Sequence, residues 1–201
     1  MTAVDLETLP LRERKRLQAM RRIQTVAMEL FERDGFDAVT IETIAAAAEV
    51  SPSSVYRWFG TKEHLVIWDE YDPQAIAAIT RELATTPPLE AVRRVVEAVF
   101  GAAMATDDER IRRRMRLAFA TPAIEAASTL QAYEMANLIG QVLAAALGRD
   151  ARDLEVQVTA HALAGGILGS LRAWHDSDFT LPFDQVVDAS LAVLERGAPI
   201  R

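Results

Sequence analysis

The amino-acid sequence predicts an all-α protein of about nine helices, and three observations support this. Half of the 201 residues are hydrophobic, enough to form a substantial core. Ala, Leu, Glu and Arg dominate, whereas strand-forming Val, Ile and Thr are sparse. Apolar residues recur at steps of three and four almost everywhere, as in the stripe Ile23, Ala27, Leu30 and Phe31.

The first 50 residues carry the start and stop signals of two helices. A first helix is expected from about Leu11 to Asp34, because Gly35 then supplies a left-handed C-terminal stop. Thr40 is a favourable N-cap, so a second helix is expected from Ile41 to about Ala48.

A third, short helix follows a tight turn near residues 48–50. Ser51 is its expected N-cap, Pro52 its first helical residue and Gly60 its end. Two short helices joined in this way make a helix-turn-helix over about residues 40–59. So short a third helix is not stable alone in water and must pack on its neighbours. The expected packing positions are Ile41, Ile44, Ala45, Val50, Val55 and Phe59.

Beyond residue 62 the helix breakers are few and predict about six helices. Thr61 is expected to cap a helix that begins at Lys62. The expected spans are 62–71 continuing through 74–84, then 89–105, 108–120, 123–147, 152–175 and 183–196. The chain is therefore divided into a helix-turn-helix domain, residues 1–60, and a helical domain, residues 61–201.

Charge is distributed unevenly along the chain. The net charge of −7 argues at first sight against nucleic acid. Residues 1–62, however, carry nine basic and nine acidic residues, and residues 12–22 carry six basic residues against Glu13 alone. A neutral front with a basic arm fits a DNA-binding head on a body that DNA repels. The alternative is a solvated helix face.

Several classes of protein are excluded by what the sequence lacks. Without cysteine there is no disulfide or thiolate metal site. The first residues lack an apolar signal segment, and the longest apolar run, Val158 to Leu171, is too short to cross a bilayer. We therefore expect a soluble, cytoplasmic protein without a membrane partner. The histidines show no metal-ligand spacing, so no metal, cofactor or catalytic residue is expected.

The segment IAAAAEVSPSSVYRWFGTKEHL, Ile44 to Leu65, resembles the signature of the tetracycline-repressor (TetR) family. The preceding AMELFERDGFDAVTI, residues 27–41, resembles the first helix and link of that family. The resemblance covers about residues 21–66, and the all-helical remainder that follows it, about 135 residues, matches only in length and class. It implies a ligand-responsive transcriptional regulator, by default a repressor, that binds a pseudo-palindromic operator as a homodimer.

The resemblance and the side-chain chemistry together assign the expected DNA contacts. Ser53 and Ser54 begin the third helix and are expected near base edges or phosphates, although hydroxyls discriminate bases weakly. The family uses the tyrosine that matches Tyr56 to reach phosphate. Arg57 could bind phosphate, guanine or a carboxylate of its own domain. The expected contacts are Arg12, Arg14, Lys15, Arg16, Thr40, Ser51, Pro52, Ser53, Ser54, Tyr56, Arg57, Trp58 and Lys62.

Two expected helix starts and the basic arm supply the phosphate contacts of this set. Thr40 and Lys62 each begin an expected helix, and helix N-termini attract phosphates. A cation at Lys62 opposes the dipole of its own helix, which a nearby phosphate would explain. Trp58 could donate its indole N–H or cover the helix junction. The arm Arg12–Arg16 is expected in a minor groove or disordered on the DNA backbone.

The helix expected at 152–175 is apolar nearly all round from Val158 to Leu171, which indicates burial on several sides. Its glycines permit close approach of helices. With the helix at 183–196 it is expected to form a four-helix dimer interface, as in the family; the alternative is a monomer core. The expected interface residues are Gly165, Gly166, Leu168, Gly169, Val187, Leu191 and Leu194.

The middle of the chain is expected to hold a largely apolar pocket for an unidentified small-molecule effector. For each candidate, ordinary core packing is the alternative. The arginine run from Arg110 to Arg116 is interpreted as a solvated face, or as a site for an anionic effector such as an acyl-coenzyme A. The helix at 62–84, bent at Pro73, is the expected lever between pocket and DNA. The candidates are Trp68, Tyr71, Phe100, Met104, Met115, Phe119, Tyr133, Asn137, Gln141 and His161.

Two other classes of protein are alternatives to a transcriptional regulator. A helical adaptor would use the helix-turn-helix for protein contacts, and salt-dependent DNA binding would distinguish it. A small helical enzyme would need converging acid, base or nucleophile groups, which the sequence does not offer.

Overall fold

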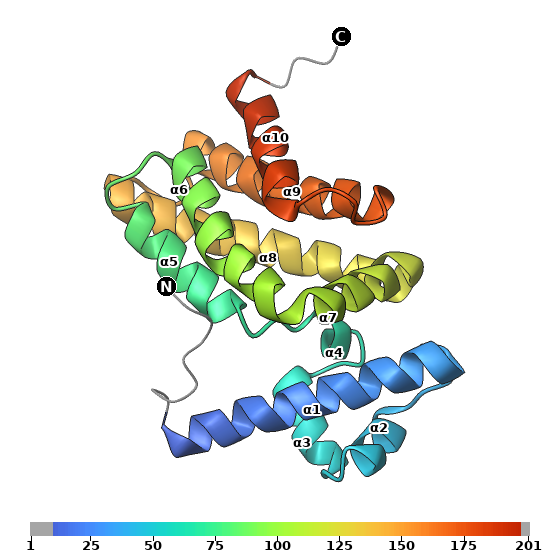
Figure 1. Ribbon diagram of the computed structural model, residues 1–201. Coiled ribbons are helices and arrows are strands. Elements are labelled where there is room, and N and C mark those ends of the chain that lie inside the picture. Colours follow the sequence, from blue (N-terminus) through green and yellow to red (C-terminus); the bar gives the residue numbers. More distant parts are fainter. Residues whose placement is uncertain (1–9, 198–201) are drawn as a thin grey trace. The chain divides into compact units, whose positions relative to one another are not determined.

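The computed structural model describes residues 10–197, and this described part is built from helices without a strand. The predicted all-α fold class is confirmed. Figure 1 shows the helices in chain order, coloured from blue to red. Their bounds are α1 Leu11–Asp34, α2 Ile41–Ala47, α3 Pro52–Phe59, α4 His64–Ile67, α5 Asp72–Glu82, α6 Pro88–Val95, the π-helical η2 Val96–Phe100, α7 Gly101–Ala120, α8 Pro122–Leu147, α9 Leu154–Asp176 and α10 Phe183–Glu195.

The described chain divides into two compact units. The head unit contains residues 10–70 and 113–128, and the body unit contains residues 71–112 and 129–197. Both α7 and α8 cross the boundary between the units. The head unit therefore includes the end of α7 and the start of α8 besides α1–α4. The expected boundary after residue 60, between a DNA-binding domain and an effector-binding domain, stays a prediction.

The caps of α2 and α3 form as the sequence predicts. Thr40 Oγ1 accepts a hydrogen bond from the backbone N–H of Thr43 at 3.1 Å. Ser51 Oγ accepts one from the backbone N–H of Ser54 at 3.2 Å. Each cap satisfies a donor that the first helical turn leaves unpaired, which fixes where the helix begins.

The head unit has one continuous apolar core, to which α1 contributes Ile23, Ala27 and Phe31. Gly35 and Gly60 follow α1 and α3 with φ of +87° and +76°, a region that side chains disfavour. The core holds the eight-residue α3 in place, as its length requires. Of the expected packing residues of the helix-turn-helix, Val50 is half-buried. The others are buried, namely Ile41, Ile44, Ala45, Val55 and Phe59.

The predicted helix over residues 62–84 is wrong in its first half. Only His64–Ile67 is helical there, and residues 68–71 are irregular before α5 begins at Asp72. Pro73 lies in the first turn of α5, where its fixed φ and missing N–H are tolerated. It therefore begins a helix and does not bend one, and the expected continuous lever does not exist.

The predicted cap at Thr61 is also wrong. Its hydroxyl lies 2.9 Å from His64 Nδ1, and α4 begins two residues later than expected, without a side-chain cap. Lys62 precedes the helix and is not part of it.

Residues 88–120 form a nearly unbroken helical run of α6, η2 and α7. The predicted break near Asp107 survives as a kink, since that residue has φ −129° and ψ 21° inside α7. The π-helical turn of η2 was not predicted, because one wide turn barely alters the spacing of apolar residues.

The last three helices confirm the predicted spans to within two residues at each end. In the body unit α9 packs against α10, and Leu163 and Trp174 of α9 and Val187 and Leu191 of α10 are buried. No helix of the described chain has both the length and the apolar character needed to cross a membrane. Residues 10–197 contain no group of acidic, His or Cys side chains that could hold a metal ion.

Candidate nucleic-acid interface

The helix α3 presents a polar face because its apolar residues point into the head core. Val55 and Phe59 are buried, whereas Ser53, Tyr56 and Arg57 are exposed. Tyr56 and Arg57 can donate hydrogen bonds through long side chains, and Ser53 carries a short hydroxyl. Such a face can approach DNA closely at its N-terminal end.

The serines at the start of α3 form a small hydroxyl cluster. Ser51 Oγ lies 2.9 Å from both Ser53 Oγ and Ser54 Oγ. Ser51 is engaged as the cap, and Ser54 is half-buried. Of the three, Ser53 is thus the most available to a base edge. Pro52, also expected at the interface, is exposed beside it.

The hydroxyl of Tyr56 is held near an acidic side chain. It donates to Glu42 Oε1 at 3.3 Å, and the tyrosine is 48% exposed. Desolvation and the Glu42 carboxylate raise the pKa of this hydroxyl above its ordinary value. Tyr56 therefore stays protonated at neutral pH and remains a hydrogen-bond donor, as a phosphate contact requires.

The first turns of α1 and the exposed side of α3 form an open groove of about 800 Å³. We call it the basic groove, and four of its seven lining residues are cationic. The residues of the expected basic arm, 12–16, belong to α1, which begins at Leu11. The alternative of a disordered arm is therefore wrong. Arg14 is half-buried and does not line the groove. The lining residues are Pro10, Arg12, Glu13, Lys15, Arg16, Arg57 and Trp58.

The cations of the basic groove differ from most other arginines of the chain. Among residues 10–197, no ion pair involves Arg12, Lys15 or Arg16, whereas Arg93, for example, pairs with Glu195 at 2.7 Å. Cations in the first turns of a helix also oppose its dipole. These charges are therefore unfavourable in the isolated protein and available to an anion.

Arg57 and Trp58 close one side of the basic groove. The guanidinium carbon of Arg57 lies 5.4 Å from the centre of the Trp58 ring, a cation–π contact. Trp58 is half-buried and packs on the head core. The interpretation of Trp58 as a cover of the helix junction is therefore compatible with its place in the groove.

Lys62 lies elsewhere than its expected role suggests. Its ammonium donates to the carbonyl oxygens of Phe36 at 2.7 Å and Val39 at 3.1 Å, and it lies 4.2 Å from the centre of the Phe36 ring. These contacts hold the link between α1 and α2. We therefore leave Lys62 out of the proposed phosphate contacts and give it a structural part.

Most arginines of the run form ion pairs within the chain. Arg113 forms two hydrogen bonds to the carboxylate of Glu32, at 2.5 and 2.9 Å, and lowers the pKa of Glu32. Arg110 and Arg112 pair with Asp107 and Asp108, at 2.9 and 2.7 Å. Arg114 is buried, and within the run only Arg116 is classed as exposed.

Side chains from α1 and α7 bind the carbonyl oxygens at the end of α4. Arg114 donates to Val66 O at 2.9 Å and Ile67 O at 3.1 Å, and its ion pair with Asp69 is 3.3 Å long. Gln24, 1% exposed, donates to the carbonyls of residues 65 and 68 at 3.0 and 2.8 Å. Neither of these roles was predicted from the sequence, although a glutamine inside the apolar stripe of α1 was a possible signal.

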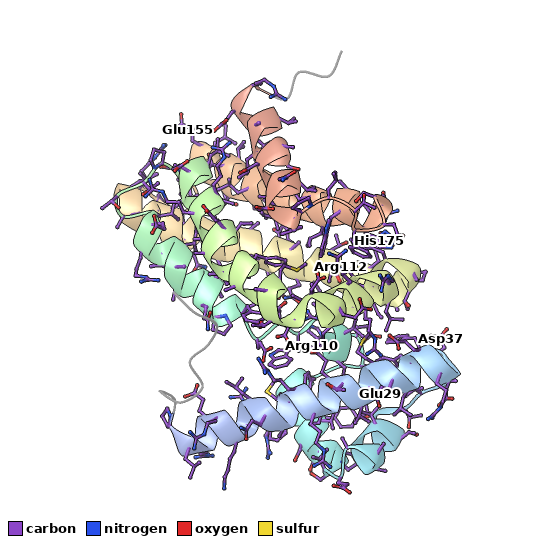
Figure 2. The ribbon with its side chains drawn as sticks, in the orientation of Figure 1. Glu29, Asp37, Arg110, Arg112, Glu155 and His175 are labelled. Atoms are coloured by element: carbon purple, nitrogen blue, oxygen red, sulfur yellow. The ribbon has the colours of Figure 1, made fainter. Side chains whose placement is uncertain are left out.

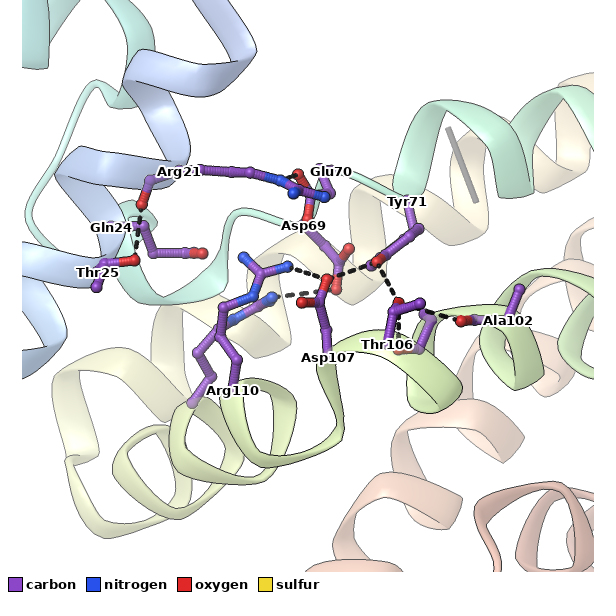
Figure 3. Close-up of polar contacts among 12 residues, drawn as sticks. Arg21, Gln24, Thr25, Asp69, Glu70, Tyr71, Ala102, Thr106, Asp107 and Arg110 are labelled. Atoms are coloured by element: carbon purple, nitrogen blue, oxygen red, sulfur yellow. Dashed lines mark hydrogen bonds and ion pairs between the residues drawn. The ribbon is translucent and has the colours of Figure 1, made fainter. Parts of the chain in front are cut away.

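Glu70 and Tyr71, the last two residues of the segment between α4 and α5, each bind a charged side chain (Figure 3). In the head unit Arg21 pairs with the buried Glu70. In the body unit the Tyr71 hydroxyl donates to Asp107 Oδ2 at 2.6 Å, and Asp107 also accepts from Arg110. Tyr71 thereby braces the kink of α7, and its place in an effector pocket stays a prediction.

The expected effector residues are distributed over both units, and their place in one pocket stays a prediction. Trp68, Met115 and Phe119 belong to the head unit, and Trp68 packs edge-on against Phe59 at 5.7 Å between ring centres. Gln141 is exposed. Within the body unit Tyr133 contacts His161, whose Nδ1 lies 2.9 Å from a backbone carbonyl, and Asn137 is half-buried. Phe100 and Met104 line a cavity of the body unit.

The expected interface residues differ in how far other parts of the described chain cover them. Val187 and Leu191 are 1% and 0% exposed, so they are covered within the chain and we leave them out of the interface. A Cβ at Gly166 would lie 3.3 Å from Leu194 Cδ1, so this pair marks close packing of α9 on α10. Leu168 is half-buried. Gly165 and Gly169 face open space within the chain.

Comparisons with known proteins decide the family. A family model described as bacterial regulatory proteins of the tetR family matches residues 23–67, which hold half of α1 and all of α2–α4. A second model, described as the MftR C-terminal domain, matches residues 86–199, more than half of the chain. The chain belongs to the TetR family of transcriptional regulators. Members are DNA-binding transcription factors and not enzymes, which excludes the enzyme alternative.

Two curated relatives of this TetR-family chain are also regulators. The transcriptional regulator TcmR of Streptomyces glaucescens is 30% identical over 150 residues, covering 71% of this chain and 66% of TcmR. MftR of Mycobacterium tuberculosis, assigned to regulation of mycofactocin biosynthesis, is 24% identical over 163 residues, covering 80% and 82%. The match to TcmR thus spans about two thirds of that protein.

Solved structures share the fold of this TetR-family chain. NalD, the secondary repressor of the MexAB-OprM multidrug efflux pump in Pseudomonas aeruginosa, is similar with a TM-score of 0.56 and 22% identity, covering 90% of this chain and 95% of NalD. FadR of Thermus thermophilus, solved with lauroyl-CoA, has a TM-score of 0.54 and 23% identity, covering 90% and 96%. At these identities the likeness shows the arrangement of helices alone.

Proposed function

We propose that this TetR-family regulator is a repressor that binds a pseudo-palindromic operator as a homodimer and releases it when a small, largely apolar effector binds. One observation carries the proposal: the basic groove unites cations of α1 with the exposed side of α3. Phosphate contacts position a protein on DNA, and base contacts add sequence specificity. A groove that joins both kinds of group on neighbouring helices suits both tasks.

The proposal divides the expected DNA contacts by role. Ser53 and Arg57 are the groups for base edges, because they are exposed at the start and on the outer face of α3. Tyr56 and the groove cations are the groups for phosphates. Thr40 and Ser51 act chiefly as caps, because their side chains already accept backbone N–H groups.

Selection of DNA from a random library with the full chain tests the proposal. We expect an enriched motif with two-fold symmetry, with half-sites about one helical turn apart or a multiple of that distance. Binding to this motif should weaken steeply as salt rises. Failure to retain any DNA at low salt would refute the proposal and favour the helical adaptor.

The hydroxyl of Tyr56 should contribute directly to operator affinity. Replacing Tyr56→Phe keeps the ring and removes only the donor. Loss of one hydrogen bond to a charged group costs about tenfold, and a dimer loses two, so the dissociation constant should rise about 100-fold. Fluorescence anisotropy on the selected operator measures this. The matched control is Tyr133→Phe in the body unit, where the tyrosine is 57% exposed. Equal affinities of the wild-type protein and both variants would contradict the assignment.

The proposed dimer uses a face of α9 that the chain itself does not cover. Leu154 and Val158 are 77% and 58% exposed, and Gly165 and Gly169 are exposed on the same side of the helix. At 100° per residue these four positions fall within about 60° of arc. An apolar stripe with two glycines suits close packing against a symmetry mate.

Substitution Gly169→Leu tests this face. A Cβ at this position would have open space around it among the described residues, so the protomer should stay folded. At a two-fold interface the extra volume appears twice, and the dimer dissociation constant should rise about 100-fold or more. Sedimentation at micromolar concentration measures it. Glu29→Leu, an exposed leucine added to α1 of the head unit, should leave the dimer intact; a dimeric Gly169→Leu would remove α9 from the interface.

The release step is proposed to act through α7 and not through the expected lever at 62–84. α7 carries body residues up to Arg112 and head residues from Arg113 onward. The head residues Arg113 and Arg114 are tied to α1 and α4 by the bonds described above. An effector that favours one conformation of the body can thus reach the head along one helix, and it weakens DNA binding only by its preference for that conformation.

A further inference from the structure

The body unit contains a cavity beside the π-helical turn η2. It has a volume of about 190 Å³, and we call it the η2 cavity. The volume corresponds to roughly six waters at about 30 Å³ each, so it suits a molecule of about ten non-hydrogen atoms. Val96 and Phe100, the first and last residues of η2, both line it. π-Helical turns occur frequently at functional sites, which makes this cavity the first candidate for a ligand.

The walls of the η2 cavity are apolar and partly aromatic. Met104 of α7 and Phe183 of α10 contribute to the lining together with Phe100. The rings of Phe100 and Phe183 lie 4.4 Å apart between centres at a tilt of 35°, and Trp174 contacts Phe183 at 5.1 Å with a tilt of 57°. A flat apolar molecule would add a further ring contact to this aromatic cluster.

One cation lines the η2 cavity, the side chain of Arg112 (labelled in Figure 2). Its guanidinium donates to Asp108 Oδ1 and to the carbonyl oxygen of Phe179, each at 2.7 Å. Its central carbon lies 5.4 and 5.6 Å from the ring centres of Trp174 and Phe179. The group is therefore held in one orientation, and its side chain is 25% exposed.

The held guanidinium retains capacity for a further acceptor. An arginine has five N–H donors, and the contacts described within residues 10–197 use two of them. The flat fork of an arginine fits a carboxylate with two parallel bonds. Asp184, the other charged lining residue, is exposed in the first turn of α10, where the helix dipole accounts for an acidic side chain.

We propose that the η2 cavity binds a small aromatic monocarboxylate, with the ring against Phe100 and Phe183 and the carboxylate on Arg112. This proposal names the chemical class of the effector. Its regulatory consequence rests on the proposed function, whereas the binding itself does not. The site is confined to the body unit, so binding does not require DNA.

Titration of the full chain with benzoate, followed by calorimetry and by line broadening of 4-fluorobenzoate, tests the site. Benzoate should bind, whereas benzamide, which is neutral, and benzylamine, which is cationic, should bind at least about tenfold more weakly. Absence of benzoate binding, equal binding of benzamide or stronger binding of benzylamine would each overturn the proposal.

Variants of the lining locate the bound molecule. Gly101 lines the cavity and a Cβ there meets no atom within 4 Å, so Gly101→Leu should fill the cavity without disturbing the helix and abolish binding. Arg112→Met should weaken binding about tenfold or more. Arg172→Met, at an exposed arginine of α9, is the charge-matched control and should bind as the wild type does. Undiminished binding by Gly101→Leu would put the ligand elsewhere and overturn the proposal.

A substitution that should increase the affinity for benzoate tests whether Arg112 binds the ligand or only supports the structure. Asp184→Asn removes a like charge beside the bound carboxylate and should tighten benzoate binding a few-fold; weaker binding would overturn the proposal. The repressor proposal is judged separately, by affinity for the selected operator without benzoate. Failure of DNA binding with intact benzoate binding would refute the repressor alone, and the reverse result would refute the η2 site alone.

Discussion

Replacing Arg12, Lys15 and Arg16 together by glutamine should weaken operator binding by a factor of the order of 10³ at low salt and flatten its dependence on salt. A dimer would lose six cations from its two basic grooves. Each phosphate contact contributes about 0.9 to the slope of log affinity against log salt, so the slope should fall by up to about 5. Anisotropy titrations at several salt concentrations measure both quantities.

The physical basis is that these cations have no ion pair among the described residues and lie in the first turns of α1. Removing them relieves an unfavourable interaction with the helix dipole, so the variant should be at least as stable as the wild type. The loss of affinity can then be attributed to missing contacts with DNA and not to unfolding.

A second triple variant provides the control for net charge. Arg149, Arg152 and Arg172 are exposed in the body unit, and their replacement by glutamine changes the charge by the same amount. We expect less than about a threefold change in affinity, because exposed charges distant from the DNA are screened. If both triple variants lost affinity equally, a general charge effect would explain the result and the basic groove would lose its assigned role.

The head unit shows which parts of a site can be predicted from sequence. The start of α3 depends on neighbours in the chain, since Ser51 caps it and Pro52 fits only its first turn. Such signals act within four residues, so a single sequence contains them in full. The end of α1 at Gly35 and the polar face of α3 follow in the same way.

Lys62 and Arg114 show where this reasoning stops. The dipole of a helix expected at Lys62 suggested a phosphate partner, but the ammonium binds carbonyl oxygens 23 and 26 residues away. Arg114 stands in a run of arginines typical of a solvated face, yet its partners lie 45–48 residues away. Neither partner can be found from local spacing, because a backbone carbonyl leaves no mark in the sequence.

The same limit applies to the ligand site. The ten candidates of the middle region included aromatic, methionine and polar residues, and two of them, Phe100 and Met104, line the η2 cavity. Arg112 was visible only as one member of the arginine run. Its place beside the cavity depends on contacts with Trp174 of α9 and with Phe179, which follows α9. The cavity also borders a π-helical turn, which the spacing of apolar residues does not reveal.

The substitution Arg114→Met should destabilise the head unit by about 3–5 kcal/mol, the usual cost of removing one partner of a buried charged network. α4 has only four residues, so its last carbonyl oxygens depend on side chains from other helices. Without the guanidinium, the carbonyls of Val66 and Ile67 lose their donors and Asp69 loses a buried cation. Against a typical total of about 5–15 kcal/mol, much of the stability would be lost.

Urea denaturation measures the change, with tryptophan fluorescence as a probe, because Trp58 and Trp68 both pack on the head core. The neighbouring Arg113→Met is the matched control. Its ion pair with Glu32 is partly exposed, so that variant should lose at most about 1 kcal/mol. Since Arg113 lowers the pKa of Glu32, this smaller contribution is present above the ordinary pKa of glutamate and is lost as the pH falls through the lowered value.

Arg114→Lys separates charge from geometry at the same position. A lysine keeps the positive charge that a helix C-terminus favours, but one ammonium cannot reproduce the flat fork that serves two carbonyls and a carboxylate. We expect a loss between those of the other two variants. If Arg114→Met were within about 1 kcal/mol of the wild type, the end of α4 would not depend on α7. The proposed route of the effector signal along that helix would then lose its connection to the head.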